Sequence, residues 1–187
     1  MLNLAKKSDS ELAVRPIKQE ALMKIRKILA PTDLSKLSRA GVRYALELAR
    51  DSGAEVTVYH VVNYDEITRF QRGSDEEATV DFVSRSPQQL LERHHQALKR
   101  FLEENCPDLL PLVTTREKVE LGKPDKSIVE EADKEAVDLI VISTHGRTGL
   151  AHMLLGSVTE KVVREATCPV LSIRPELLKD EKIVAGT

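Results

Sequence analysis

The sequence predicts a single α/β domain, a doubly wound parallel sheet of five strands with helices on both faces. Helix and strand patterns alternate along the chain from about residue 24 to residue 175. Such alternation predicts a parallel sheet, because each right-handed helical crossover returns the chain to the same strand direction. A length of 187 residues suits one domain that buries most of its apolar surface without disulfides or metals.

The first strand is predicted in "KIRKILAPTD", where Pro31 ends a short run of leucine and β-branched residues. The next segment, "SRAGVRYALELARDSGA", predicts a helix that ends at Gly53, a residue favoured just past helix ends. One face of that helix is apolar and carries Val42, Ala45, Leu46 and Ala49. The following "EVTVYHVV" is apolar or β-branched at almost every position, which is typical of a strand covered on both faces.

The second half repeats this alternation after a polar, irregular segment at residues 63–86. Pro87 opens a helix with apolar residues at helical spacing, and "LVTTREKVELG" then predicts a strand with polar alternation. A helix entered through Pro124, a short buried strand at 138–142, an amphipathic helix at 158–166 and the strand "PVLSIRP" complete the order. We therefore expect an N-terminal extension at 1–23, the domain at 24–175 and a C-terminal tail at 176–187.

Composition argues against several classes of function. A net charge of -2 and 3% aromatic residues favour neither a basic nucleic-acid surface nor stacking platforms for single strands. No apolar run approaches the roughly 18 residues of a membrane span, and the first twenty residues lack an export signal. Cys106 and Cys168 belong to no CxxC motif, which favours two reduced thiols. We expect a cytoplasmic protein with no membrane or nucleic-acid partner.

The stretch "STHGRTGLAHMLLGS", residues 143–157, is the strongest functional signal in the chain. It holds three of the eight glycines and connects a predicted strand to a predicted helix. Proteins often bind phosphate where a glycine-rich connection meets a helix N-terminus, because unpaired N–H groups and the helix dipole favour anions there. The same glycines are equally compatible with a purely structural turn.

The residue spacing suggests how phosphate would be held. Ser157 and Glu160 have the spacing of a capping box, which would start the helix at Ser157. Gly156 would leave room for a phosphate, and Gly146 and Gly149 would let the loop turn its amides inward. Hydroxyl groups that could add hydrogen bonds, or a ligand to Mg²⁺, are those of Thr144, Ser157 and Thr159. Neither the P-loop motif nor G-x-G-x-x-G is present, which argues against a P-loop ATPase or a nicotinamide dehydrogenase.

Other polar residues leave alternatives open. His145 could touch a phosphate or shape the loop, and Arg147 could pair with phosphate or cover the edge of the site. Asp33 could stabilise a turn or bind ribose. We interpret His60 as a residue of the core or of the crevice wall rather than as a base. His94 and the next residue, His95, would point about 100 degrees apart on a helix, which argues against a zinc site.

Three segments together resemble the universal stress protein family in its ATP-binding branch. They are "KILAPTDLS", "YHVV" and "STHGRTGLAHMLLGSVTEKVVREATCPVLSIRP", and the resemblance runs from about Lys24 to Pro175. The family motif is a glycine, two residues, a second glycine, nine residues, then glycine and a serine or threonine. Gly146 and the pair Gly156-Ser157 match this motif, whereas Ser143 stands at the first glycine position.

The resemblance implies the strand order 3-2-1-4-5, which places the first strand beside the fourth. It also implies ATP or ADP as the ligand, with Mg²⁺. Pro31, Thr32 and Asp33 would border the adenine and ribose, and Val61 would meet the adenine edge through its backbone. The phosphates would be held by the segment 143–159, through Ser143, Thr144, His145, Gly146, Arg147, Gly149, Gly156, Ser157, Val158 and Thr159.

Three functions fit this expectation. The first is a nucleotide-dependent regulatory module of the stress response, with at most weak ATP hydrolysis, and the second is a slow ATPase or a phosphate-transferring enzyme. The third is a stress protein that binds no nucleotide and acts through its dimer surface. We expect a homodimer through the last strand, at Val170, Leu171 and Ile173, because an apolar sheet edge invites pairing. Alternatively, the tail 176–187 covers this edge within one chain.

Overall fold

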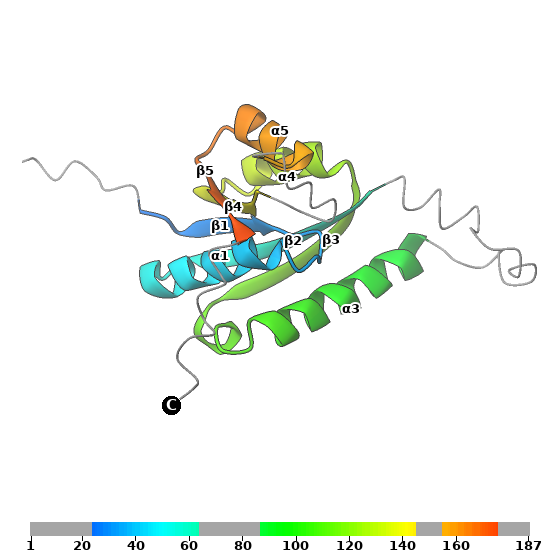
Figure 1. Ribbon diagram of the computed structural model, residues 1–187, viewed down its shortest axis with the longest axis horizontal. Helices are drawn as coiled ribbons and strands as arrows, with labels where there is room; N and C mark the ends of the chain where they lie inside the picture. The colour runs from blue at the N-terminus through cyan, green and yellow to red at the C-terminus, as the bar shows by residue number, and fades with distance from the viewer. Residues whose placement is uncertain (1–23, 64–86, 145–154, 176–187) are drawn as a thin grey trace, which may run out of the picture.

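The computed structural model describes residues 24–63, 87–144 and 155–175. They form a five-stranded parallel sheet in the order β3-β2-β1-β4-β5, with helices on both faces (Figure 1). The strands are β1 (Lys27–Pro31), β2 (Glu55–Asn63), β3 (Thr115–Gly122), β4 (Leu139–Ser143) and β5 (Val170–Ile173). The predicted fold class and the strand order expected from the family resemblance are both confirmed.

Four helices provide the crossovers within the described residues, as the alternation of patterns predicts. They are α1 (Arg39–Ser52), α3 (Pro87–Asn105), α4 (Pro124–Lys134) and α5 (Ser157–Glu165), with a short 3₁₀ turn at Leu110–Leu112 after α3. Helices α1 and α3 lie on one face of the sheet, and α4 and α5 lie on the other (Figure 1). None of the helices in the described part of the chain is long and apolar enough to cross a membrane.

Each face of the sheet has its own apolar core, because successive side chains of a strand point to opposite faces. Ile28 and Val141 pack with α1 and α3, while their neighbours Leu29 and Ile140 pack with α4 and α5. This two-sided burial explains why the inner strands are continuous apolar runs in the sequence. Cys106 and Cys168, both free thiols, pack with opposite faces.

Helix α1 ends where the sequence predicts, since Gly53 follows it with a φ of 72° and its N–H donates to the Ala49 carbonyl. Helix α5 begins at Ser157, but the predicted capping box of Ser157 and Glu160 is wrong. Gly156, not Ser157, is the N-cap residue, and no side chain caps the helix. Glu160 instead pairs with Arg164 one turn further along. The capping box fails because Ser157 already has a place inside the first turn, so Glu160 is one position too late to bond the N-cap backbone.

The strand order makes β1 and β4 neighbours, although α1, β2, α3, β3 and α4 separate them in the chain. The chain leaves β1 toward β2 and leaves β4 toward β5, on opposite sides of this parallel pair, so a crevice opens at the carboxyl ends of the two strands. Ligands of doubly wound sheets bind at this switch point. The fold therefore predicts a ligand site at the segments that follow Pro31 and Ser143.

Candidate functional site

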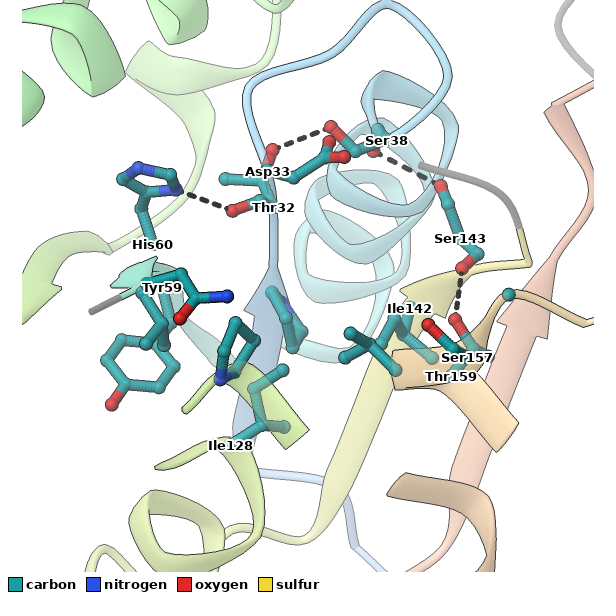
Figure 2. Close-up of a pocket in the computed structure, with 16 residues that line it drawn as sticks. Thr32, Asp33, Ser38, Tyr59, His60, Ile128, Ile142, Ser143, Ser157 and Thr159 are labelled. Atoms are coloured by element: carbon teal, nitrogen blue, oxygen red, sulfur yellow. Dashed lines mark hydrogen bonds between the residues drawn. The ribbon is translucent and has the colours of Figure 1, made fainter. Parts of the chain in front are cut away.

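A cavity of about 320 Å³ lies at the carboxyl ends of β1, β2 and β4 (Figure 2). Its volume is at the lower end of the range found for small-molecule sites. The start of α4 and the first turn of α5 close its sides. The lining residues are Pro31, Thr32, Asp33, Ser38, Tyr59, His60, Val61, Asn63, Pro124, Ile128, Ile142, Ser143, Gly156, Ser157, Val158 and Thr159.

The end of β1 is held by its own polar groups. The Thr32 N–H donates to the Tyr59 carbonyl, and the Thr32 hydroxyl lies 2.8 Å from the Ser38 hydroxyl. The Asp33 carboxylate accepts a hydrogen bond of 3.0 Å from the Ser35 N–H, which stabilises the turn into α1. Asp33 also lines the cavity, so the turn and a ligand would use the same side chain.

The Val61 backbone faces the cavity beyond the end of β1. Backbone groups alternate in direction along a strand, and the Tyr59 carbonyl points to β1, where it accepts from Thr32. The N–H and C=O of Val61 therefore point to the same side. Pairing of β1 with β2 stops at Pro31 and Tyr59, so no β1 residue bonds the Val61 N–H. One donor and one acceptor are thus presented side by side.

The wall around Val61 is apolar and neutral. Pro31, Tyr59, Ile128 and Ile142 line it from β1, β2, α4 and β4. Burial raises the pKa of Tyr59 well above its ordinary value of 10.0, and the adjacent Glu120 carboxylate raises this pKa further. The Tyr59 phenol therefore stays neutral, and the wall suits a flat, uncharged ring.

The other half of the cavity is formed by the end of β4 and the start of α5. The Thr159 hydroxyl donates to the Ser143 carbonyl at 2.8 Å (Figure 2). The Gly156 N–H donates to the Thr144 carbonyl at 2.6 Å. The side chains of Ser143, Thr144 and Thr159 are all buried. These contacts fix the first turn of α5 directly against the strand.

The Ser143 hydroxyl is directed toward α1. It accepts from the Gly41 N–H at 2.9 Å and donates to the Ser38 carbonyl at 3.2 Å. Gly41 is in the first turn of α1, where N–H groups lack partners within the helix, and Ser38, the N-cap residue, gives no side-chain cap. Ser143 therefore caps α1 from a strand 102 residues away.

Gly156 has a packing reason to be glycine. A Cβ at this position would lie 3.1 Å from the Thr144 carbonyl oxygen, closer than most such contacts allow. The contact between two backbones accounts for glycine here without a phosphate. Of the residues expected to bind phosphate, His145, Gly146, Arg147 and Gly149 lie outside the described residues.

The ends of α4 and α5 that border the cavity are tied together by an ion pair. Lys161 Nζ lies 2.9 Å from the Asp125 carboxylate, and this pairing lowers the pKa of Asp125 below its ordinary value of 3.8. Because α4 supplies Ile128 and α5 supplies Ser157, the pair keeps the two walls together.

Sequence reasoning missed several residues that line the cavity. Ile128 and Pro124 come from the helix after β3, and Ile142 and Ser38 flank segments that the motif did include. Ile128 had no distinguishing signal, because an apolar residue on a helix belongs to the core in most cases. His60 does line the cavity, which confirms its interpretation as a crevice residue, and its contact with His94 was not anticipated.

Known proteins match most of the chain. The family model of the universal stress protein family matches residues 24–174. Universal stress protein MJ0531 of Methanocaldococcus jannaschii is 35% identical over 149 residues, 80% of this chain and 82% of that relative. The solved structure of MJ0577, from the same organism, is 27% identical with a TM-score of 0.60 and covers 80% of this chain and 96% of its own.

A further solved structure is that of a universal stress protein in complex with cAMP. It has a TM-score of 0.58, is 23% identical, and covers 81% of this chain and 99% of its own, which shows a common fold. The family match over nearly the whole domain, the close curated relative and the sheet order 3-2-1-4-5 lead to one conclusion. This chain belongs to the universal stress protein family.

Proposed function

We propose that this protein is an adenine-nucleotide-binding regulatory module, with ATP or ADP and Mg²⁺ as its ligands. The observation that carries the proposal is a single cavity with two different ends. An apolar wall lies at Val61, whose backbone donor and acceptor on this side bond none of the described residues, and the N-terminus of α5 lies at the other end. An adenine nucleotide has the same polarity, with a flat base at one end and anionic phosphates at the other.

The Val61 end matches the chemistry of adenine. The base presents an N–H donor at N6 next to an acceptor at N1 on one edge. A strand N–H and C=O that point the same way offer the complementary pair. Tyr59, Ile128 and Ile142 would cover the apolar ring, and the Asp33 carboxylate would accept from the ribose hydroxyls.

The α5 end suits phosphate. The N–H groups of Ser157, Val158 and Thr159 belong to the first turn and have no partner within the helix. The helix dipole adds a partial positive charge at the same place. Mg²⁺ would be held mainly by the phosphates, as is usual for nucleotide-bound Mg²⁺, because Asp33 is the one carboxylate among the described lining residues. The residues 145–149 of the glycine loop would complete this end.

The hydrogen bonds already made by the polar lining residues favour nucleotide binding over catalysis. Hydrolysis requires a group that positions water opposite the leaving group. Of the described lining residues that could act as a base, Asp33 accepts the Ser35 N–H and His60 bonds the Thr32 carbonyl and His94. ATP occupancy would then act by changing shape or partner choice in the stress response, and we place the protein in the cytoplasm. The cAMP complex of a protein with the same fold supports an adenine nucleotide as the ligand class.

Titration calorimetry with ATP, with and without Mg²⁺, tests this function directly. Ser157 is exposed, lines the cavity and begins α5. In Ser157→Glu the new carboxylate suits the helix dipole but repels phosphate, so we expect a folded protein whose ATP affinity falls at least about tenfold. Ser157→Gln, of the same size without the charge, should lose much less.

A folded Ser157→Glu protein with unchanged ATP affinity would contradict phosphate binding at α5. A single-turnover assay with labelled ATP separates the regulatory module from a slow ATPase, since the module leaves ATP intact over many binding lifetimes. Wild-type protein that binds no adenine nucleotide, and releases none when denatured after purification, would contradict the proposed function and leave the dimer surface as the alternative.

A further inference from the structure

Two histidines from different elements meet at the cavity wall, which His60 lines. His60 of β2 is 1% exposed, and its Nε2 lies 2.9 Å from Nδ1 of His94 on α3. The two rings are nearly parallel, with centroids 5.1 Å apart and an interplanar angle of 18°. On its other side, His60 Nδ1 lies 2.8 Å from the Thr32 carbonyl oxygen, a bond drawn in Figure 2. A chain of contacts therefore runs from α3 to the end of β1.

The hydrogen bonds from His94 through His60 to Thr32 all run in one direction. A carbonyl only accepts, so His60 Nδ1 carries the hydrogen and donates it to Thr32. In a neutral imidazole the second nitrogen is then an acceptor, so His60 Nε2 accepts from the Nδ1–H of His94. The Thr32 carbonyl thereby sets the tautomer of His60, and His94 helps to hold the orientation of its ring.

The Thr32 carbonyl would otherwise continue the sheet. The Thr32 N–H donates to the Tyr59 carbonyl, and in a parallel ladder the next bond joins the Val61 N–H to the Thr32 carbonyl. That bond is absent among the described residues, and the Thr32 carbonyl accepts from His60 instead. The side chain of His60 thus takes the acceptor that would pair with Val61.

We propose that His60 and His94 are positioning residues of the nucleotide site, which hold the Thr32 carbonyl away from the ladder and so keep the Val61 N–H open to the base. The expected effect on nucleotide affinity rests on the proposed adenine-binding function. The role of His60 at the Thr32 carbonyl does not depend on a ligand. The inference assigns a role to the His60–His94 pair, and it would make base binding at Val61 depend on the polar side chain of the preceding residue.

Residue-resolved amide exchange in the nucleotide-free protein tests the role of His60 at the Thr32 carbonyl. In His60→Leu the Thr32 carbonyl loses its donor and becomes available to Val61, so exchange of the Val61 amide should slow by about tenfold or more. In His60→Asn the side-chain amide replaces the Nδ1 donor, so the Val61 amide should exchange as in the wild type. Equal Val61 exchange in wild type and His60→Leu would overturn the proposal.

Nucleotide affinity tests whether the two histidines affect binding of the base. With ATP, His60→Leu and His94→Leu should each weaken binding about three- to tenfold, the worth of one hydrogen bond. With 1-deaza-ATP, which lacks the N1 acceptor, the same variants should bind like the wild type. A variant that merely loosens the fold would weaken both nucleotides equally, and that result would also overturn the proposal.

The neighbouring His95 is the matched control. It is exposed and lies 3.7 Å from Glu117, away from His60. His95→Leu should leave both amide exchange and ATP affinity unchanged, while His94→Asn, which keeps a donor near the Nδ1 position, should restore the affinity that His94→Leu loses. Wild-type protein without ATP affinity would refute the proposed function, whereas the exchange measurement would still decide the role of His60.

Discussion

Ser143 connects three elements through a single side chain and its own carbonyl. The hydroxyl caps α1 through Gly41 and Ser38, and the carbonyl accepts from Thr159 at the start of α5. Gly41 fits because a Cβ there would lie 2.8 Å from the Ser143 backbone nitrogen. The family motif has glycine at position 143, and here a serine supplies the cap that Ser38 does not.

We therefore expect Ser143→Ala to lower the free energy of unfolding by about 1–3 kcal/mol, because the buried Gly41 N–H loses its acceptor. Ser143→Gly should lose at least as much, since glycine also gains backbone freedom in the unfolded chain. Both variants should keep their nucleotide affinity, because the hydroxyl is occupied at α1. Urea unfolding and calorimetric titration measure the two effects.

The control for this pair of variants is Ser172→Ala, which changes an exposed serine of β5 and should shift stability by less than about 0.5 kcal/mol. Full wild-type stability in Ser143→Ala would show that the α1 cap contributes nothing. Lost nucleotide affinity in a stable Ser143→Gly protein would instead make the serine a ligand.

Among the elements, the β1–β4 pair is short for its importance to the site. Only Ile28 and Leu29 are in register with β4, opposite Leu139 and Ile140. The Asp138 carboxylate extends this connection, since it accepts from the Arg26 and Lys27 N–H groups at 2.8 and 2.9 Å. These two bonds hold the pKa of Asp138 below its ordinary value of 3.8.

A carboxyl group whose pKa is lower in the folded state stabilises the fold most when it is ionised. The contribution of Asp138 is therefore complete at neutral pH, above the ordinary pKa, and is lost as the pH falls through the lower folded pKa. Asp138→Asn should reduce stability by about 1 kcal/mol at pH 7, a value kept small because the group is close to solvent. The difference from the wild type should shrink as the pH falls below the ordinary pKa of 3.8.

Urea unfolding between pH 2 and pH 7 measures this difference. Asp51→Asn is the control, because Asp51 forms an exposed ion pair with its neighbour Arg50 and should change stability little. A difference between Asp138→Asn and the wild type that stays constant across this range would contradict the role given to the carboxylate.

At the scale of the whole molecule, the two edges of the sheet differ. The β3 edge carries the charged residues Arg116, Glu117, Lys118 and Glu120, which discourage pairing with another chain. The β5 edge has no charged residue within the strand. Val170 and Leu171 are half-buried there, whereas Ile173 packs into the core and is not available to a partner. The homodimer through β5 remains our proposal.

Backbone direction provides a sharp test of this dimer. Pro169 and Ile173 turn their carbonyls to β4, so by alternation the Ser172 N–H points to the open edge. Ser172→Pro removes that outward donor without breaking the β4 ladder, and proline is tolerated on edge strands. We expect light scattering to give about twice 20.9 kDa for the wild type and 20.9 kDa for Ser172→Pro.

Leu171→Lys should also give the monomer mass, because a charge at the β5 surface opposes pairing of two copies. Circular dichroism checks that both variants stay folded. A wild-type mass of 20.9 kDa at micromolar concentration would refute the dimer and favour the alternative in which residues 176–187, outside the described residues, cover the edge.

The sequence by itself determined the fold class, the order of elements and the segments at the carboxyl ends of β1 and β4. These depend on local signals: apolar runs over strand lengths, glycine at Gly53 and prolines at strand and helix ends. The family resemblance added the strand order, which the sheet confirms. It also supplied the ligand expectation, which remains a proposal.

Only the tertiary structure decided which side chains meet. Ser143 caps a helix 102 residues away, and His60 reaches His94 on the other side of a crossover. The N-cap of α5 is Gly156 instead of Ser157, because contacts with β4, rather than a local capping box, hold the first turn. Such contacts join residues far apart in the chain, so their geometry depends on how the sheet and helices pack, and no spacing in the sequence records it.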